Sequence, residues 1–190
     1  EGQSRKYGMS TLAVHAGARP DPVTGARGTP IYQTTSFVFD DAEHGAELFN
    51  LQTFGYVYSR MTNPTVSVFE ERVAQLEGGR GAVATSSGHA AQFIAAATLM
   101  EAGDEFIASR NLYGGSVTQF GVSFPKLGWK CNFVDPTDPE NFEKAMNDKV
   151  KFIFCEGVAN PGGIILDLEK IADIAHKHGV LLIVDNTLAS

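Results

Sequence analysis

The sequence predicts an α/β fold in which helices cover both faces of a mostly parallel sheet. Short apolar runs alternate with helical patterns along the second two thirds of the chain. The last run, at residues 180–184, has no polar alternation, which is typical of a strand buried on both faces of a parallel sheet. Strand, helix and strand in this order indicate right-handed crossovers, so we expect functional sites at the carboxyl ends of the strands.

Residues 1–64 are predicted to form an extended amino-terminal arm. This segment is rich in turn-forming glycine, proline and aspartate and shows little sustained periodicity. Regular structure is expected from Thr65, which can cap the helix that follows. That helix has apolar residues at helical spacing and ends at Gly78 and Gly79. Residues 65–190 are therefore expected to form the first part of a larger domain.

Five strands and four further helices are predicted after this first helix. The strands are expected at residues 82–85, 105–108, 130–134, 150–155 and 180–184. The helices are expected at residues 90–100, 116–127, 140–146 and 168–178. This regular alternation predicts a repeated strand and helix unit, without an internal sequence repeat.

The bulk composition favours small-molecule chemistry over binding to nucleic acid or to a membrane. The 190 residues are 43% hydrophobic, and their net charge of −7 comes without a clustered basic stretch. No apolar stretch approaches the ~20 residues of a membrane helix, and the polar amino terminus lacks an apolar signal core. Cys131 and Cys155 lie far apart in apolar runs, so we expect reduced core thiols, no metal site and a cytoplasmic protein.

The end of the first predicted strand has the features of an anion site. Ser87, Gly88 and His89 lead directly into a helix of small residues. Gly88 lets a ligand approach the backbone, and the helix start presents free N–H groups, which together favour a phosphate. The alternative is that Ser87 is a plain helix cap, which by itself is commoner.

A second glycine motif, at residues 79–84, matches the dinucleotide fingerprint with Ala in the last place. That fingerprint needs a strand before it and a helix after it, because the helix start must face the pyrophosphate. Here the motif follows a helix and enters a strand. We therefore interpret it as a turn between a helix and a strand.

The other strand ends carry an aromatic ring, an amide and two acids. Tyr113 follows the second strand, Glu156 and Asn160 follow the fourth, and Asp185 ends the fifth. Each of these residues has an alternative role in a turn, and for Asp185 alone the two interpretations are evenly balanced. A planar, phosphorylated ring that contains nitrogen would use all of these groups together.

Tyr58 and Arg60 lie upstream, two residues apart on a segment that we expect to be extended. Their side chains would then point the same way. Arginine binds phosphate well through its two-pronged guanidinium group. The alternative is a surface pair next to a turn.

These residues together resemble the pyridoxal-phosphate enzymes of cysteine and methionine metabolism, over nearly the whole chain. That family has the aspartate aminotransferase fold, known as fold type I. The segments that carry the resemblance are Tyr58-Ser59-Arg60, Asn63-Pro64-Thr65, Ser87-Gly88, Leu112-Tyr113-Gly114, Asn160-Pro161 and Val184-Asp185-Asn186-Thr187. Their order and spacing fit the family as well as their identity.

The resemblance implies a role for each matching position. The backbone of Gly88 and His89, with Ser87 nearby, would hold the phosphate of pyridoxal 5'-phosphate (PLP), and Thr187 would also bind the cofactor. Tyr113 would stack on the ring and assist proton movement, and Asn160 would contact the ring hydroxyl. Asp185 would pair with the protonated ring nitrogen, so that the ring can accept negative charge. Tyr58 and Arg60 would reach the phosphate in a neighbouring subunit, so at least a homodimer, and commonly a homotetramer, is implied.

Within the family the chain is most similar to the O-acetylhomoserine sulfhydrylases, which make homocysteine and acetate from O-acetylhomoserine and sulfide. The implied reaction is a γ-replacement, in which acetate leaves the substrate γ-carbon and sulfide takes its place. Methionine gamma-lyases often have Cys where this chain has Gly115, which argues against a lyase. The alternatives within the family are a reaction of the cystathionine gamma-synthase type or of the methionine gamma-lyase type. Two positions depart from the family pattern: Gly157 replaces a usual Ser, and His89 a usual Met.

The lysine that binds the cofactor covalently is not expected among the lysines of this chain. Those lysines flank predicted helices and strands away from the polar strand ends. In the family this lysine follows Asp185, so the 190 residues alone are expected to be inactive. A non-catalytic fragment and a nucleotide-dependent dehydrogenase are the alternatives from other classes.

Overall fold

The computed structural model describes residues 7–189, which divide into two compact units at the junction of Thr85 and Ser86. Each unit is described by itself. The junction lies later than the expected boundary after residue 64, because the helix that begins there packs within the first unit. Helix α3 (Pro64–Glu77) contacts α1 (Met9–His15), and the Arg72 guanidinium donates a hydrogen bond to the Ala16 carbonyl at 3.0 Å.

The first unit contains two helices within the predicted extended arm, so the expectation of an extended chain is wrong for residues 9–15 and 42–49. Helix α2 (Ala42–Phe49) begins at Asp41, whose carboxylate accepts a hydrogen bond from the His44 N–H at 2.8 Å. Helix α1 has no side-chain cap and spans only seven residues, so its periodicity is weak. The other described residues from Tyr7 to Asn63 form turns and irregular segments, with one isolated bridge among them, between Ser36 and Tyr58.

Helix α3 begins one residue before the predicted cap. The Asn63 side chain accepts the Thr65 N–H at 2.9 Å, and Pro64 takes the first helical position, where no N–H donor is needed. The Thr65 hydroxyl instead donates to the Pro30 carbonyl at 2.8 Å. The predicted end is confirmed, because Gly78 adopts the left-handed conformation that closes the helix, with φ of 66°.

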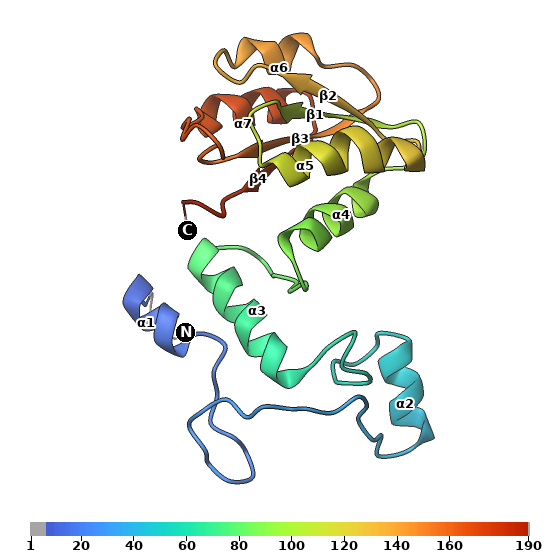
Figure 1. Ribbon diagram of the computed structural model, residues 1–190. Coiled ribbons are helices and arrows are strands. Elements are labelled where there is room, and N and C mark those ends of the chain that lie inside the picture. Colours follow the sequence, from blue (N-terminus) through green and yellow to red (C-terminus); the bar gives the residue numbers. More distant parts are fainter. Residues whose placement is uncertain (1–6, 190) are drawn as a thin grey trace. The chain divides into compact units, whose positions relative to one another are not determined.

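The second unit is built on a four-stranded sheet in which all neighbours are parallel (Figure 1). Its strands are β1 (Glu105–Ser109), β2 (Lys130–Val134), β3 (Val150–Glu156) and β4 (Leu181–Asp185), in the spatial order β2-β1-β3-β4. The chain therefore moves from β1 outward to β2, and then returns past β1 to β3 and β4. This change of direction falls between β1 and β3, where open sheets of this kind bind ligands.

Helices cover both faces of the sheet, as predicted (Figure 1). One face packs against α4 (Gly88–Leu99) and against a segment that contains α5 (Gly114–Thr118), the π-helical turn η1 (Gln119–Ser123) and the 3₁₀ turn η2 (Phe124–Leu127). The other face packs against α6 (Glu140–Lys144) and α7 (Leu168–Lys177). The single helix predicted at residues 116–127 is thus divided into three short segments. Pro125 lies in the first turn of η2, where it has no N–H to continue the hydrogen bonds of the preceding turn.

Each face has its own apolar core, because alternate strand residues point to opposite sides. Phe106, Phe120, Phe124 and Phe152 pack on the α4 face, where the Phe106 and Phe152 rings stack with centroids 4.7 Å apart. The α7 face contains Ile107, Phe142, Ile153, Cys155 and Ile171, all fully buried. Among residues 7–189, no helix is both long and apolar enough to cross a membrane.

Two strand predictions need correction. Residues 82–85 form no strand, because within the described chain no other strand pairs with them; the Ala84 N–H donates to the Glu70 carboxylate at 2.7 Å, and Val83 is 78% exposed. Strand β4 exists, but it is not buried on both faces. It pairs only with β3 among the described residues and so lies at the sheet edge, with Leu181 exposed.

Candidate functional site

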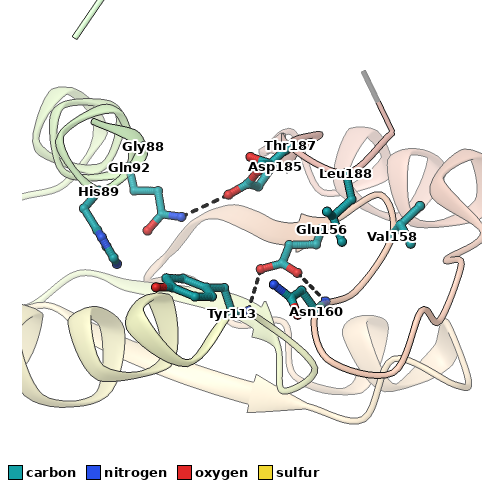
Figure 2. A pocket seen from close by; sticks show the side chains of 10 residues that line it. All are labelled: Gly88, His89, Gln92, Tyr113, Glu156, Val158, Asn160, Asp185, Thr187 and Leu188. Atoms are coloured by element: carbon teal, nitrogen blue, oxygen red, sulfur yellow. Dashed lines mark hydrogen bonds between the residues drawn. The ribbon is translucent and has the colours of Figure 1, made fainter. Parts of the chain in front are cut away.

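A cavity of about 320 Å³ opens at the carboxyl ends of β3 and β4 in the second unit (Figure 2). Ten side chains and backbones from four elements and their loops line it: Gly88, His89, Gln92, Tyr113, Glu156, Val158, Asn160, Asp185, Thr187 and Leu188. The cavity lies beside the point where the strand order reverses. The cavity therefore lies at the carboxyl end of the sheet, where the sequence analysis expects a site.

The amino-terminal turn of α4 forms one wall of this cavity. Ser87 caps the helix, and its hydroxyl accepts the Ala90 N–H at 3.1 Å. The amides of Gly88 and His89 hold the first two helical positions, where no carbonyl of the helix can accept their hydrogen bonds. A Cβ atom added at Gly88 would meet no other atom within 4 Å, so the cavity side of this turn is open. The turn can therefore bind an anion through its backbone.

The Tyr113 ring faces this turn from the start of α5. It is 52% exposed, and its centroid lies 5.9 Å from that of the His89 imidazole, at a tilt of 44°. Both rings need Gly115 beneath them, because a Cβ atom there would lie 2.5 Å from His89 Cε1 and 2.6 Å from Tyr113 Cε1. The exposed face of Tyr113 is available for stacking on a planar ligand.

Glu156, at the end of β3, holds two loops of the site in place. Its side chain is 5% exposed and accepts backbone N–H groups from Tyr113 at 2.6 Å and from Asn160 at 2.9 Å. Figure 2 shows both hydrogen bonds converging on this carboxylate. The positions of the Tyr113 ring and of the Asn160 amide thus depend on one buried acid.

Asp185, at the end of β4, is held through both carboxylate oxygens. Oδ1 accepts the Thr187 hydroxyl at 2.5 Å and the Thr187 N–H at 3.1 Å, and Oδ2 accepts the Gln92 amide N–H at 3.2 Å. The Thr187 bonds form the turn that was the competing interpretation of this residue. Asp185 is therefore both a turn residue and an acid that lines the cavity, so the two interpretations do not exclude each other.

Of the nine residues proposed for cofactor binding, six line the cavity: Gly88, His89, Tyr113, Asn160, Asp185 and Thr187. Ser87 lies next to it as the cap of α4. Tyr58 and Arg60 belong to the first unit and do not line it. The extended backbone predicted for this pair is wrong, because the Met61 N–H closes a turn on the Tyr58 carbonyl at 2.9 Å. The Arg60 guanidinium carbon lies 5.4 Å from the centroid of the Tyr58 ring.

The sequence analysis gave no role to Gln92, although its signal was present. Gln92 follows Gly88 by four residues, which places both on one face of α4. Glu156 was noted as an acid at a strand end, but its two backbone partners could not be read from the sequence. The structure also offers an explanation for glycine at position 157, because a Cβ atom there would lie 2.7 Å from Asn186 Oδ1.

These residues fit a planar ring that carries a phosphate and a basic ring nitrogen. The α4 amides suit the phosphate, the open face of Tyr113 suits the ring, and the Asp185 carboxylate suits a protonated nitrogen. The Gln92 Oε1 atom is buried next to the cavity without a hydrogen-bond partner in the described part of the chain, which marks unfilled polar capacity. Among residues 7–189, no three His, Cys, Asp or Glu side chains gather as metal ligands.

Comparisons with known proteins agree with this geometry. The family model for Cys/Met metabolism PLP-dependent enzymes matches residues 10–190. The chain is 48% identical to the O-acetyl-L-homoserine sulfhydrylase of Leptospira meyeri, over 100% of the chain and 43% of that protein. It is 51% identical to Sulfhydrylase FUB7 of Gibberella moniliformis, over 96% of the chain and 42% of that protein.

A solved structure gives the same result. It is that of a putative O-acetylhomoserine (thiol)-lyase from Campylobacter jejuni, which contains N'-pyridoxyl-lysine-5'-monophosphate. The TM-score is 0.95 at 37% identity, and the match covers 97% of this chain and 45% of that one. The chain thus spans less than half the length of the relatives it matches. The predicted fold type I architecture is confirmed, and the chain belongs to the family of PLP-dependent enzymes of Cys/Met metabolism.

Proposed function

We propose that the protein containing this chain converts O-acetyl-L-homoserine and sulfide into L-homocysteine and acetate with the help of PLP. One observation carries the proposal: a carboxylate at a strand end, Asp185, is held from both oxygens beside a half-exposed Tyr113 ring and the amino-terminal turn of α4. The relatives that share this chain's sequence at 48 and 51% identity are sulfhydrylases by name.

The cofactor, when bound, supplies a ring that accepts the negative charge developing on the substrate carbon. Gly88 and His89 bind the phosphate through their backbone N–H groups, and Ser87 shapes that turn. Asp185 accepts a hydrogen bond from the protonated ring nitrogen and so keeps the proton there. Thr187 holds Asp185 Oδ1 in the orientation this requires.

Two further residues serve the ring and the substrate. Tyr113 stacks on the cofactor ring and uses its hydroxyl to move protons at the substrate. Both roles are open to it because the tyrosine side chain is exposed on the cavity side. Asn160 contacts the ring hydroxyl, and its loop is fixed by the hydrogen bond from its N–H to Glu156. Glu156 itself supports both residues from below the cavity.

The complete site needs more than one copy of this segment. In this proposal Tyr58 and Arg60 contact the phosphate in a neighbouring subunit, so the enzyme is at least a homodimer and, like other members of the family, a homotetramer. The residues 1–64 are the arm that makes this reach. The lysine that binds the cofactor lies outside the 190 residues. A cytoplasmic location agrees with Cys131 and Cys155, which are free thiols of apolar strands.

The test uses the full-length enzyme that contains this chain, loaded with PLP. We expect homocysteine and acetate from O-acetylhomoserine and sulfide, measured by mass spectrometry, at a higher kcat/KM than from the O-succinyl or O-phospho esters. Cysteine in place of sulfide tests for cystathionine, and methionine as substrate tests for methanethiol and 2-oxobutanoate. Faster formation of either of these products would assign the enzyme to the other branches of the family.

The 190 residues alone provide a second test of the same proposal. Mixed with PLP and reduced with borohydride, they should show no stoichiometric labelling of a single lysine in a peptide map. The full-length enzyme is the matched control and should be labelled at one lysine beyond Asp185. Specific labelling within the 190 residues would refute the assignment of the lysine.

A further inference from the structure

The Gln92 side chain connects two elements across the roof of the cavity. Its amide nitrogen lies 3.2 Å from Asp185 Oδ2 (Figure 2). The same nitrogen lies 2.9 Å from the Ser116 hydroxyl oxygen. Its Oε1 atom is buried and has no hydrogen-bond partner among the described residues. A glutamine in this position is therefore only half satisfied by the protein.

The orientation of this amide follows from its neighbours. A carboxylate accepts hydrogen bonds and cannot donate them, so the end of the amide that faces Asp185 must be the NH₂ group. Turning the amide over would bring Oε1 against Oδ2, two acceptors at a distance where they repel. The donor end is thus fixed toward Asp185, and the unpaired Oε1 is the consequence of that choice.

Gln92 also differs in kind from the other group that holds Asp185. Thr187 follows Asp185 by two residues and moves with the same turn, so it cannot fix that turn relative to the rest of the site. Gln92 belongs to α4, the helix whose first turn contains Gly88 and His89. Four residues of helix separate Gly88 from Gln92, which is a rise of about 6 Å along one face.

We propose that Gln92 is a positioning residue that fixes the Asp185 carboxylate relative to the first turn of α4. The helix then acts as a spacer between the group that binds the cofactor phosphate and the group that meets the ring nitrogen. This inference rests on the proposed function in one respect, namely that the ligand is PLP. It does not depend on which acyl ester or thiol the enzyme uses.

The variants separate this role from a purely structural one. Gln92→Leu keeps the approximate size of the side chain but removes the donor to Asp185. Gln92→Glu keeps the shape and places a second acceptor against Oδ2. Ser116→Ala is the matched control, because it removes the other hydrogen bond of Gln92 and leaves the bond to Asp185 intact. Ser116 is fully buried and does not line the cavity.

The experiment uses the full-length holoenzyme reconstituted with PLP that carries ¹⁵N in its ring. For Gln92→Leu we expect the ¹⁵N resonance to move toward that of a neutral pyridine and kcat to fall about tenfold, as for loss of a hydrogen bond to a charged group. The dissociation constant of PLP should change much less, because the α4 amides are untouched. Gln92→Glu should also lower kcat, because two acceptors then face each other and Asp185 loses its position. Ser116→Ala should leave both readouts near those of the unmodified enzyme.

Two outcomes would overturn the inference. One is an unchanged ¹⁵N resonance and kcat in Gln92→Leu, and the other is an equal change in Ser116→Ala. Circular dichroism and a thermal melt establish whether each variant is folded. If Gln92→Leu does not fold, the comparison is made with Gln92→Glu. If the unmodified enzyme binds PLP but forms no homocysteine, the proposed function fails while the ¹⁵N comparison still decides the role of Gln92.

Discussion

The carboxylates at the two ends of the parallel sheet have different hydrogen-bond donors. At the amino end, Glu105 accepts Lys130 Nζ at 3.1 Å and the side-chain amides of Asn132 and Asn147 at 2.7 and 3.1 Å. These donors, the Asn132 amide first and Lys130 second, lower the pKa of Glu105 to about 2 from its usual 4.5. At the carboxyl end, Asp185 and Glu156 meet only uncharged donors.

The two ends differ in whether a positively charged side chain neutralises the carboxylate. Among residues 7–189, no lysine, arginine or histidine forms an ion pair with Asp185 or Glu156. Hydroxyl, amide and backbone N–H groups orient a carboxylate without cancelling its charge. At the amino end of the sheet, the charge of Glu105 is therefore balanced by Lys130 within the protein, and this contact stabilises the fold. The carboxyl end keeps an oriented negative charge at the cavity, where a cationic ring nitrogen supplies the missing partner.

Removal of Asp185 should give the largest effect and the clearest test of this comparison. In the full-length enzyme, we expect Asp185→Ala to lower kcat about 100-fold or more, since a preorganised charge at the reacting ligand is lost. PLP should still bind, more weakly, as measured by absorbance titration. The thermal melting temperature of the apoenzyme should change little, because the Asp185 side chain is only half-buried. Full retained activity would contradict the assignment.

Replacement of Glu105 tests the other end of the sheet. Its lowered pKa means that Glu105 stabilises the fold above pH 4.5, and that this contribution is lost as the pH falls toward about 2. Glu105→Gln should therefore reduce the free energy of unfolding at pH 7 by at most about 3 kcal/mol, with a smaller deficit near pH 3.

Urea unfolding at several pH values measures this difference directly. The kcat of the folded Glu105→Gln enzyme should stay close to that of the unmodified enzyme, because Glu105 does not line the cavity. A deficit in stability that is independent of pH between 7 and 3 would show that the ionised form of Glu105 is not its source.

Glu156 lies at the carboxyl end but acts through backbone donors, so it should show a mixed and smaller effect. In the unmodified protein, the two oxygens of Glu156 accept one backbone N–H each, from Tyr113 and from Asn160. Glu156→Gln leaves only one acceptor oxygen for these two N–H groups. We expect a loss of about 1–2 kcal/mol in the free energy of unfolding, because one buried N–H loses its acceptor. PLP affinity should fall as well, since Tyr113 loses its fixed position. Unchanged affinity and stability would mean that the two loops are held by other contacts.

Much of the second unit could be predicted from local pattern. The runs at 105–108, 130–134 and 150–155 are strands because their neighbours in the sheet come from the same stretch of chain. The run at 82–85 has the same apolar character, but no strand among the described residues pairs with it, and pairing is not a local property. Helices α1 and α2 were missed because helices of seven and eight residues are marginal by themselves and depend on contacts that the sequence does not display.

The site was predicted through the strand ends, which topology brings to one edge. Tyr113 and Asn160 follow strands and Asp185 ends one, so their convergence needed only the order of the elements. The contribution of Gln92 needed the exact placement of α4 over β4, and the support by Glu156 needed two backbone amides to meet one side chain. Such contacts arise from packing between elements and have no signature in spacing alone.

The absence of a side chain at Gly115 limits which substitutions from related enzymes this site can accept. The His89 and Tyr113 rings both occupy the space where a side chain at position 115 would begin. Positions 89 and 115 are thus sterically coupled, although they are far apart in the chain. A cysteine grafted at 115 to imitate a lyase would displace the imidazole or the phenol ring unless residue 89 were changed with it. Any redesign of specificity at this wall has to treat the two positions as one.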